Sequence, residues 1–324
     1  MSWIMWGLAW IRRVLLMAML LMMASANGTE AGLPVVRVAL DLWPGYYPVV
    51  IAQKQGYFAK RGLQVDYTIP ENTDQMLEAF AAGKVDVVCV ALGDVFAFRE
   101  RVPSLRVVML SDESAGGDAL VSLKPLPQTL KGLRVGTNLN GFGELFVRAF
   151  VRQQNASLKD IVLVNQEASK AAVMLSEGKV DVAHTWEPYV SELTSYNDAT
   201  VVFTSERTPG LIPDAVVMHG NLLQQPERAR AFVAAWLEAA EWWLTHRHAG
   251  NRIAERALLL MPNTVNLEGI RLFDGKANRA AFQKSGSESS IFQTTQLYID
   301  YFREKGVIKS TVTPDDVVTS AYLP

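Results

Sequence analysis

Aromatic and acidic residues follow the first strand-like segment of the chain. The run VVRVALDLW (35–43) is typical of a buried strand, and a Pro-Gly pair forces a turn directly after it. Asp41, Trp43 and Tyr46 lie at this strand end. Aromatic rings beside a carboxylate can stack on a flat organic molecule or enclose an amine. Each ring taken alone could equally well serve only to position the following helix.

Two later strand ends carry similar residues. In the sequence ALGDV, Gly93 allows a close backbone approach, and Asp94 is suited to cap the next helix with one oxygen left for a ligand. In AHTWEPYV, Trp186 lies at the strand tip, and Glu187 is predicted to cap a helix that opens with proline. We therefore expect Trp186 to face Trp43 across a cleft.

A junction rich in glycine and asparagine, TNLNGFGE, offers a different kind of contact. Asn138, Asn140, Gly141 and Phe142 lie where backbone N–H groups at a helix N-terminus can hold an anion or a polar oxygen. The junction lacks the Gly-Lys-Ser/Thr of a P-loop and the third glycine of the dinucleotide fingerprint. Glu144 in the first turn of the helix would compete with a bound anion.

The sequence predicts no catalytic machinery. It contains neither Gly-x-Ser-x-Gly nor His-Glu-x-x-His. Cys89 is the single cysteine, which excludes an internal disulfide and a four-cysteine metal site, and we interpret it as an inert core residue. His184 is interpreted as a core histidine with satisfied hydrogen bonds. We therefore predict no enzyme activity, no cofactor and no metal.

The pentapeptide GKVDV occurs twice, at residues 83–87 and 178–182. Each copy follows a helix-like run and leads into a strand-like run, and a glycine after an apolar helix is a usual helix stop. Strand-like and helix-like segments alternate over residues 35–111 and again over residues 133–205. This alternation is typical of βα units around mostly parallel sheets and predicts an α/β protein with two similar lobes.

Two extended crossovers, near residues 120–126 and 212–218, are predicted to form a two-strand hinge between the lobes. After the second crossover only helices are expected, the clearest at 226–246, whose apolar face should pack against a sheet. In open α/β sheets, ligands bind beyond the carboxyl ends of the strands, which here face the cleft. The predicted lobes are residues 34–124 plus 214–324, and residues 125–213.

The N-terminus has the pattern of a secretory signal. Within residues 12–26, two arginines precede a short apolar run and the triplet Ala24-Ser25-Ala26, which predicts cleavage after Ala26 and export to the periplasm. The apolar residues ahead of the arginines leave open an uncleaved anchor or a later start. Of the 324 residues 49% are hydrophobic and 20% charged, as in globular proteins, and the net charge of −2 predicts no nucleic-acid partner.

The segment DLWPGYYPVVIAQKQGYFAKRGLQVDY (41–67) resembles the periplasmic substrate-binding proteins of nitrate, sulfonate, taurine and thiamine-precursor importers. GKVDVV, LRVGTNLNGFGE and GKVDVAHTWEPYV extend the resemblance over about residues 35–220. The resemblance implies a two-lobed type II periplasmic binding fold. It also implies a monomer that captures a small molecule and delivers it to an ABC permease and ATPase, without chemistry of its own.

The chain departs from that family pattern at the ligand. Taurine and sulfonate binders offer Ser/Thr-rich turns, whereas the predicted cleft here offers the carboxylates of Asp41, Asp94, Glu144 and Glu187 and no basic residue at a strand end. Since a buried charge needs a partner, a nitrogen-containing organic ligand is favoured and a sulfonate or related anion comes second. Two other classes remain open: a ligand-sensing module for a membrane signalling protein, and an enzyme similar to thiamine-pyrimidine synthase. The synthase would need a histidine in the cleft, and none precedes His184.

Overall fold

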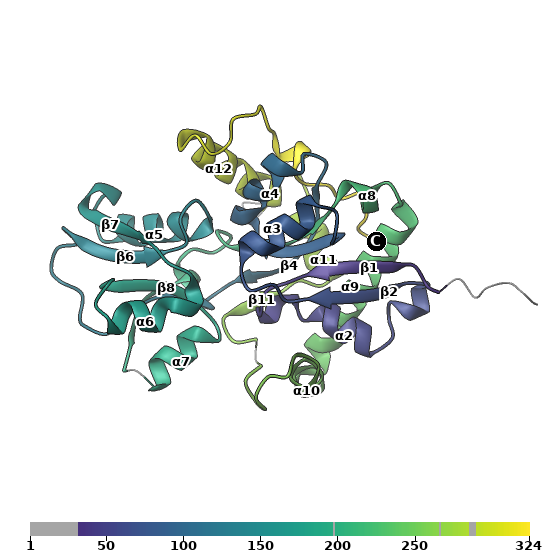
Figure 1. Ribbon diagram of the computed structural model, residues 1–324, viewed down its shortest axis with the longest axis horizontal. Helices are drawn as coiled ribbons and strands as arrows, with labels where there is room; N and C mark the ends of the chain where they lie inside the picture. The colour runs from purple at the N-terminus through teal and green to yellow at the C-terminus, as the bar shows by residue number, and fades with distance from the viewer. Residues whose placement is uncertain (1–31, 197, 266, 285–289) are drawn as a thin grey trace, which may run out of the picture. The chain divides into compact units, whose positions relative to one another are not determined.

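The computed structural model describes residues 32–196, 198–265, 267–284 and 290–324. The predicted signal peptide lies outside these residues. From Val35 onward the chain forms two β-sheets with helices around them (Figure 1). No helix within the described ranges combines the length and the apolar character that a membrane span requires.

The first sheet has the strand order β11-β4-β10-β3-β1-β2. Strand β1 is parallel to β2 and β3, whereas β10 is antiparallel to β3 and β4. Its strands are β1 (Val35–Ala39), β2 (Gln64–Thr68), β3 (Val87–Ala91), β4 (Arg106–Ser114), β10 (Pro213–Met218) and β11 (Ile270–Leu272). The expectation that only helices follow the second crossover is wrong for β11. This strand has three residues, too few to show a period in the sequence, and it forms by pairing with β4.

The second sheet repeats this plan with the order β7-β6-β8-β5-β9. In each sheet the strand that follows a crossing pairs antiparallel with a strand of the parallel set, β10 with β3 in the first sheet and β5 with β8 in the second. The strands of the second sheet are β5 (Asp118–Ser122), β6 (Leu133–Thr137), β7 (Ile161–Asn165), β8 (Val182–Trp186) and β9 (Thr200–Thr204). The predicted α/β fold with two similar lobes is confirmed.

The chain leaves the first sheet earlier than the predicted boundary after residue 124. Strand β5 pairs with β8 and β9, so it belongs to the second sheet, although the sequence assigned residues 118–122 to the first lobe. Extended residues look alike in a sequence whichever sheet they join, and only the pairing decides. The chain crosses between β4 and β5, and it returns between β9 and β10. The predicted hinge segments 120–126 and 212–218 therefore lie too late in the chain, because they overlap β5 and β10, which pair within the sheets.

The two GKVDV copies stop their helices in the same way. Gly83 follows α3 (Thr73–Ala81) with φ +66°, and Gly178 follows α6 (Ala171–Ser176) with φ +63°. These are left-handed conformations, which glycine adopts without steric cost. The glycine stop predicted for both copies is confirmed.

The aspartate of each copy binds an arginine on a neighbouring parallel strand of its own sheet. Arg37 on β1 places its Nε 3.0 Å from an Asp86 oxygen and donates to the Gly83 carbonyl. Arg134 on β6 does the same with Asp181, also at 3.0 Å, and with the Gly178 carbonyl. The repeated sequence therefore forms the same interaction once in each lobe, in which an arginine binds the aspartate and the glycine carbonyl of the copy.

The helices cover the sheets and fill the core. Trp236 and Trp243 on α9 are completely buried, and Trp243 stacks on Tyr47 with ring centroids 6.5 Å apart. The predicted apolar face of this helix is confirmed, and it packs against α2 as well as the first sheet. The other helices are α2 (Pro48–Lys54), α4 (Val95–Arg101), α5 (Phe142–Gln153), α7 (Tyr189–Tyr196), α8 (Gly220–Leu223), α9 (Pro226–Thr245), α10 (Arg247–Leu258), α11 (Gly275–Ala281) and α12 (Ile291–Glu304).

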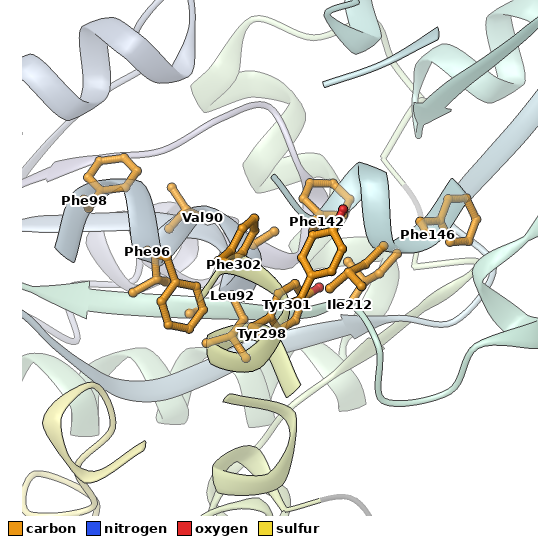
Figure 2. Packing of buried hydrophobic residues seen from close by; sticks show 14 of the residues in the cluster. Val90, Leu92, Phe96, Phe98, Phe142, Phe146, Ile212, Tyr298, Tyr301 and Phe302 are labelled. Carbon is orange, nitrogen blue, oxygen red and sulfur yellow. The ribbon is translucent and has the colours of Figure 1, made fainter. Parts of the chain in front are cut away.

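One apolar cluster includes residues from both lobes. Phe142 and Phe146 of α5, in the second lobe, belong to the same cluster as Leu92, Tyr298 and Phe302 of the first (Figure 2). Burial of such aromatic side chains contributes about 1.5–3 kcal/mol each to folding. The lobes are therefore held together by apolar contact beside the crossing strands.

Candidate ligand-binding site

A cavity of about 60 Å³ lies where the ends of β1, β3, β6 and β8 meet the first residues of β5 and β10. This is the edge at which open α/β sheets bind ligands. Seven predicted site residues are among those that line it: Asp41, Trp43, Tyr46, Asp94, Asn138, Phe142 and Trp186. Their contact with a ligand stays a prediction.

A second cavity, of about 420 Å³, adjoins the first. We call the first the inner cavity and the second the outer cavity. The two cavities share Asn72, Thr73, Asp94 and Asn138 in their walls. The predicted residues Asn140 and Gly141 line this outer cavity rather than the inner one.

Two predicted residues line neither cavity. Gly93 packs against the second lobe, because a Cβ added there would lie 2.7 Å from the Phe142 Cβ. The close approach expected at Gly93 therefore occurs toward protein. The Glu187 carboxylate accepts a hydrogen bond from the Ser191 N–H at 3.1 Å and so caps the first turn of α7, although this helix begins at Tyr189 and not at the predicted Pro188. Its predicted second role at the ligand has no support in this geometry.

Asp94 does not make the cap expected of it. It stands at the N-cap position of α4 without a side-chain cap hydrogen bond. Its carboxylate instead accepts a hydrogen bond from the backbone N–H of Phe142, across in the second lobe. Burial raises the pKa of Asp94 to about 7, although that hydrogen bond acts in the opposite direction.

Two buried carboxylates of the cavity were missed from the sequence. Asp118 begins β5 and Asp214 lies at the start of β10, so each crossing strand brings one acid into the cavity. Asp118 is bonded to His184 Nε2 at 3.1 Å, and Asp214 accepts from the Tyr46 hydroxyl. The similar segments GDAL and PDAV were the available signal, since both open a crossing strand.

Asp112 forms a buried pair with Asp214 behind the cavity wall. The two are opposite each other on β4 and β10, and Asp112 is completely buried. Asp112 accepts from Trp43 Nε1 at 2.9 Å and from the Ser111 hydroxyl at 2.8 Å. Burial raises the pKa of Asp112 to about 7, and burial with repulsion from Asp112 raises that of Asp214 well above its usual value. Trp43 is thus fixed by a hydrogen bond as well as by packing.

Glu144 does not compete for a bound anion, contrary to the prediction. It is buried and turned toward α12, where it accepts from the Tyr301 hydroxyl at 3.0 Å and from Lys305 Nζ at 2.7 Å. Its charge is therefore neutralised away from the cavity. The partner lies more than 150 residues later in the chain, so helix position alone could not reveal it.

His184 and Cys89 behave as core residues. Both ring nitrogens of His184 have partners, Thr137 Oγ1 and Asp118 Oδ1, each at 3.1 Å, as expected of a satisfied core histidine. Cys89 is buried in β3, and burial together with Asp214 and Asp112 raises the pKa of its thiol well above the usual value. It lines the inner cavity but is not poised as a thiolate nucleophile.

The inner cavity is acidic. Four carboxylates line it, and among the described lining residues there is no lysine, arginine or histidine. Asp41 is exposed at the end of β1 and accepts only from its neighbour Leu42, whereas Asp118 and Asp214 are buried. Carboxylate oxygens with two aromatic rings nearby, Trp43 and Trp186, suit a ligand that donates hydrogen bonds or carries positive charge.

Two α/β lobes with this strand order, joined by two crossing strands around a cavity, define the periplasmic binding protein fold. The structure of the alkanesulfonate-binding protein SsuA of Xanthomonas axonopodis pv. citri, bound to MOPS, aligns with a TM-score of 0.71. The alignment has 14% sequence identity and covers 90% of this chain and 99% of that protein.

The family described as NMT1/THI5 like matches residues 43–249, and the chain belongs to this family. A protein of Brucella abortus that is named as a binding protein is 20% identical over 292 residues, 87% of this chain and 88% of that protein. The 4-amino-5-hydroxymethyl-2-methylpyrimidine phosphate synthase of Uromyces fabae is 28% identical over 144 residues, 43% of this chain and 41% of that enzyme.

Proposed function

We propose that this chain is an extracytoplasmic solute-binding protein that captures a small organic molecule between its lobes and delivers it to an ABC importer. The fold, the family and the relatives that are named as binding proteins support this class. The observation that carries it is the cavity at the strand ends, to which both lobes and both crossing strands contribute residues.

The ligand we propose is a nitrogen-containing organic molecule, such as an amine or an aminopyrimidine. A ligand enclosed by two lobes loses its water, so each charged group needs an opposite charge or several hydrogen bonds. The carboxyl groups of Asp41, Asp94, Asp118 and Asp214 offer oxygens to an N–H donor, and those that are ionised repel an anion. A sulfonate or related anion is the second candidate, because the similar solved protein is an alkanesulfonate binder.

Binding requires the lobes to move. The outer cavity of about 420 Å³ is within the range of ligand pockets, roughly 300–1,000 Å³, but the inner cavity of about 60 Å³ is far smaller. A ligand held among the carboxyl groups of the inner cavity therefore needs an opened state to enter. We assign the hinge to the crossing residues 114–118 and 205–213. Ser205 ties the two crossings, because its hydroxyl accepts from the Gly116 N–H at 2.7 Å and lies 2.8 Å from the Ser114 hydroxyl.

The proposed class of solute-binding protein implies a location and partners in the cell. The signal-like N-terminus supports export to the periplasm as a monomer that works with an ABC permease and ATPase. A sensor that reports the same ligand to a membrane signalling protein would use the same lobes, and the neighbouring genes distinguish the two. The synthase-like alternative is supported by the similarity to the Uromyces enzyme. It would place a histidine at the ligand, and none is among the described residues that line the inner cavity.

A thermal-shift screen of the purified protein tests the proposal. A ligand at a hundred times its Kd adds about 2.7 kcal/mol of stability, which is a clear rise in Tm. Aminopyrimidines and amines should raise the Tm, whereas alkanesulfonates, taurine and nitrate should not. Stabilisation by sulfonates or nitrate alone would overturn the ligand assignment, and no stabilisation by any of these compounds would count against the binding function.

Matched variants locate the site. Trp186→Ala and Asp41→Asn should each abolish or weaken the shift with an amine, because both residues line the inner cavity. Glu187→Gln is the control, since Glu187 caps a helix and lines neither cavity. A loss of binding in the Glu187 variant, with binding retained in the other two, would place the site elsewhere.

A further inference from the structure

We propose that Asp94 determines ligand specificity: its carboxylate fills the N-terminus of α5 as a built-in anion and makes the chain reject oxyanion ligands. The inference rests on the proposed binding function and concerns the same site. It explains how a chain with a glycine-rich helix N-terminus at its ligand cavity can still select a positively charged molecule.

The helix N-terminus lacks a cap from its own segment. The twelve-residue helix α5 begins at Phe142, and its N-cap residue Gly141 provides no side-chain hydrogen bond. The first N–H groups of a helix have no partner within the helix and must find an acceptor elsewhere. Asp94, from the other lobe, is the acceptor for Phe142.

The backbone is shaped to let this carboxylate come close. A Cβ added at Gly141 would lie 2.6 Å from Asp94 Oδ1, and one added at Gly93 would lie 2.8 Å from the Phe142 nitrogen. Real Cβ atoms do not approach so closely, so both glycines are required for the contact. The contact joins the end of β3 in the first lobe to the start of α5 in the second, and Asp94, Asn138 and Phe142 all line the inner cavity.

The position of Asp94 gives it opposite effects on the two ligand classes. An oxyanion would need the N–H groups that Asp94 already uses and would face its negative charge at close range. Like charges brought together at a binding site lower affinity by on the order of a hundredfold or more. A cation can instead use the second Asp94 oxygen while the first stays on the helix.

Two variants separate the charge of Asp94 from its place at the helix. Asp94→Ser removes the charge and shortens the side chain, which opens the N–H groups to a ligand. Asp94→Asn is the matched control, because it removes the charge but keeps an oxygen that can still accept from Phe142. If the serine variant does not fold, Asp94→Ala takes its place with the same expectation.

The experiment is a calorimetric titration of wild type, Asp94→Ser and Asp94→Asn with methanesulfonate, nitrate and benzylamine. It is carried out at pH 8.5, above the pKa of about 7 of Asp94, so that the wild-type carboxylate is charged. Both variants should bind methanesulfonate or nitrate more tightly than wild type, because both lose the charge. The serine variant also frees the Phe142 N–H, so its gain of about a hundredfold should clearly exceed that of the asparagine variant. Both variants should lose affinity for benzylamine by about tenfold or more, because each lacks the charge.

The outcomes distinguish this inference from the proposed function. A folded serine variant that gains no anion binding, beside a wild type that binds benzylamine, overturns the role of Asp94 and leaves the proposed function standing. An asparagine variant that gains as much anion affinity as the serine variant also overturns it, because charge alone would then decide. Tight binding of methanesulfonate by the wild type overturns this inference and the proposed ligand class, and leaves the solute-binding function standing.

Discussion

Replacing Asp112 by asparagine should remove one large contribution to the pH dependence of stability. Asp112 is completely buried, and its pKa is raised from 3.8 to about 7 by burial. A difference of that size between the folded and unfolded chain corresponds to about 4 kcal/mol. Because the folded pKa is the higher one, this stability is present below about pH 4 and is lost as the pH rises through 7.

The variant cannot ionise, so it does not suffer this loss. Its amide oxygen can still accept from Trp43 Nε1, and its amide nitrogen can donate to the Ser111 hydroxyl. We expect equal stability of the variant and wild type near pH 4 and an advantage for the variant of up to about 4 kcal/mol at pH 8.

Urea unfolding of both proteins from pH 4 to pH 8, followed by tryptophan fluorescence, measures the difference directly. Glu206→Gln is the control, because Glu206 is exposed and its replacement should leave the profile unchanged. If the free energy of unfolding of Asp112→Asn changes with pH in parallel with that of wild type from pH 4 to pH 8, the reasoning about the buried carboxylate pair is refuted.

Two further changes test the contacts that join the lobes. Lys305→Met removes the charged partner of buried Glu144, while Tyr301 remains as a hydrogen-bond donor. We expect the free energy of unfolding in urea to fall by about 1–3 kcal/mol. An unchanged urea midpoint would mean that the ion pair contributes nothing to stability. Ser205→Ala leaves the Gly116 N–H in the hinge without its acceptor. We expect about 1–3 kcal/mol lower stability and faster hydrogen exchange at that amide. An unchanged exchange rate would argue against a stabilising role for this hydrogen bond.

The sequence predicted the α/β class and the two lobes because both depend on local sequence patterns. The GKVDV copies show their helix stop, and the alternation of strands and helices shows the α/β class. Strand ends carry Trp43 and Trp186 to the cavity because the ends of parallel strands meet at one edge of a sheet. These features depend on near neighbours in the chain.

The rest depends on distant partners. Glu144 lies in the first turn of α5 as predicted, but its direction is set by Tyr301 and Lys305 on the last long helix. Asp118 and Asp214 reach the cavity because their strands cross between sheets, and no local period distinguishes a crossing strand from a connector. Asp94 has the sequence of a helix cap, yet its carboxylate bonds to the other lobe.

The central claim is that the two lobes close on a nitrogen-containing ligand held in the cavity between them. Small-angle X-ray scattering of the purified protein with a saturating aminopyrimidine, with taurine, and without either compound tests it most directly. The radius of gyration should fall with the aminopyrimidine and stay unchanged with taurine, because hinge closure requires a ligand that the carboxylates accept. A radius that falls with taurine alone, or that responds to neither compound although the aminopyrimidine is bound, would contradict the account.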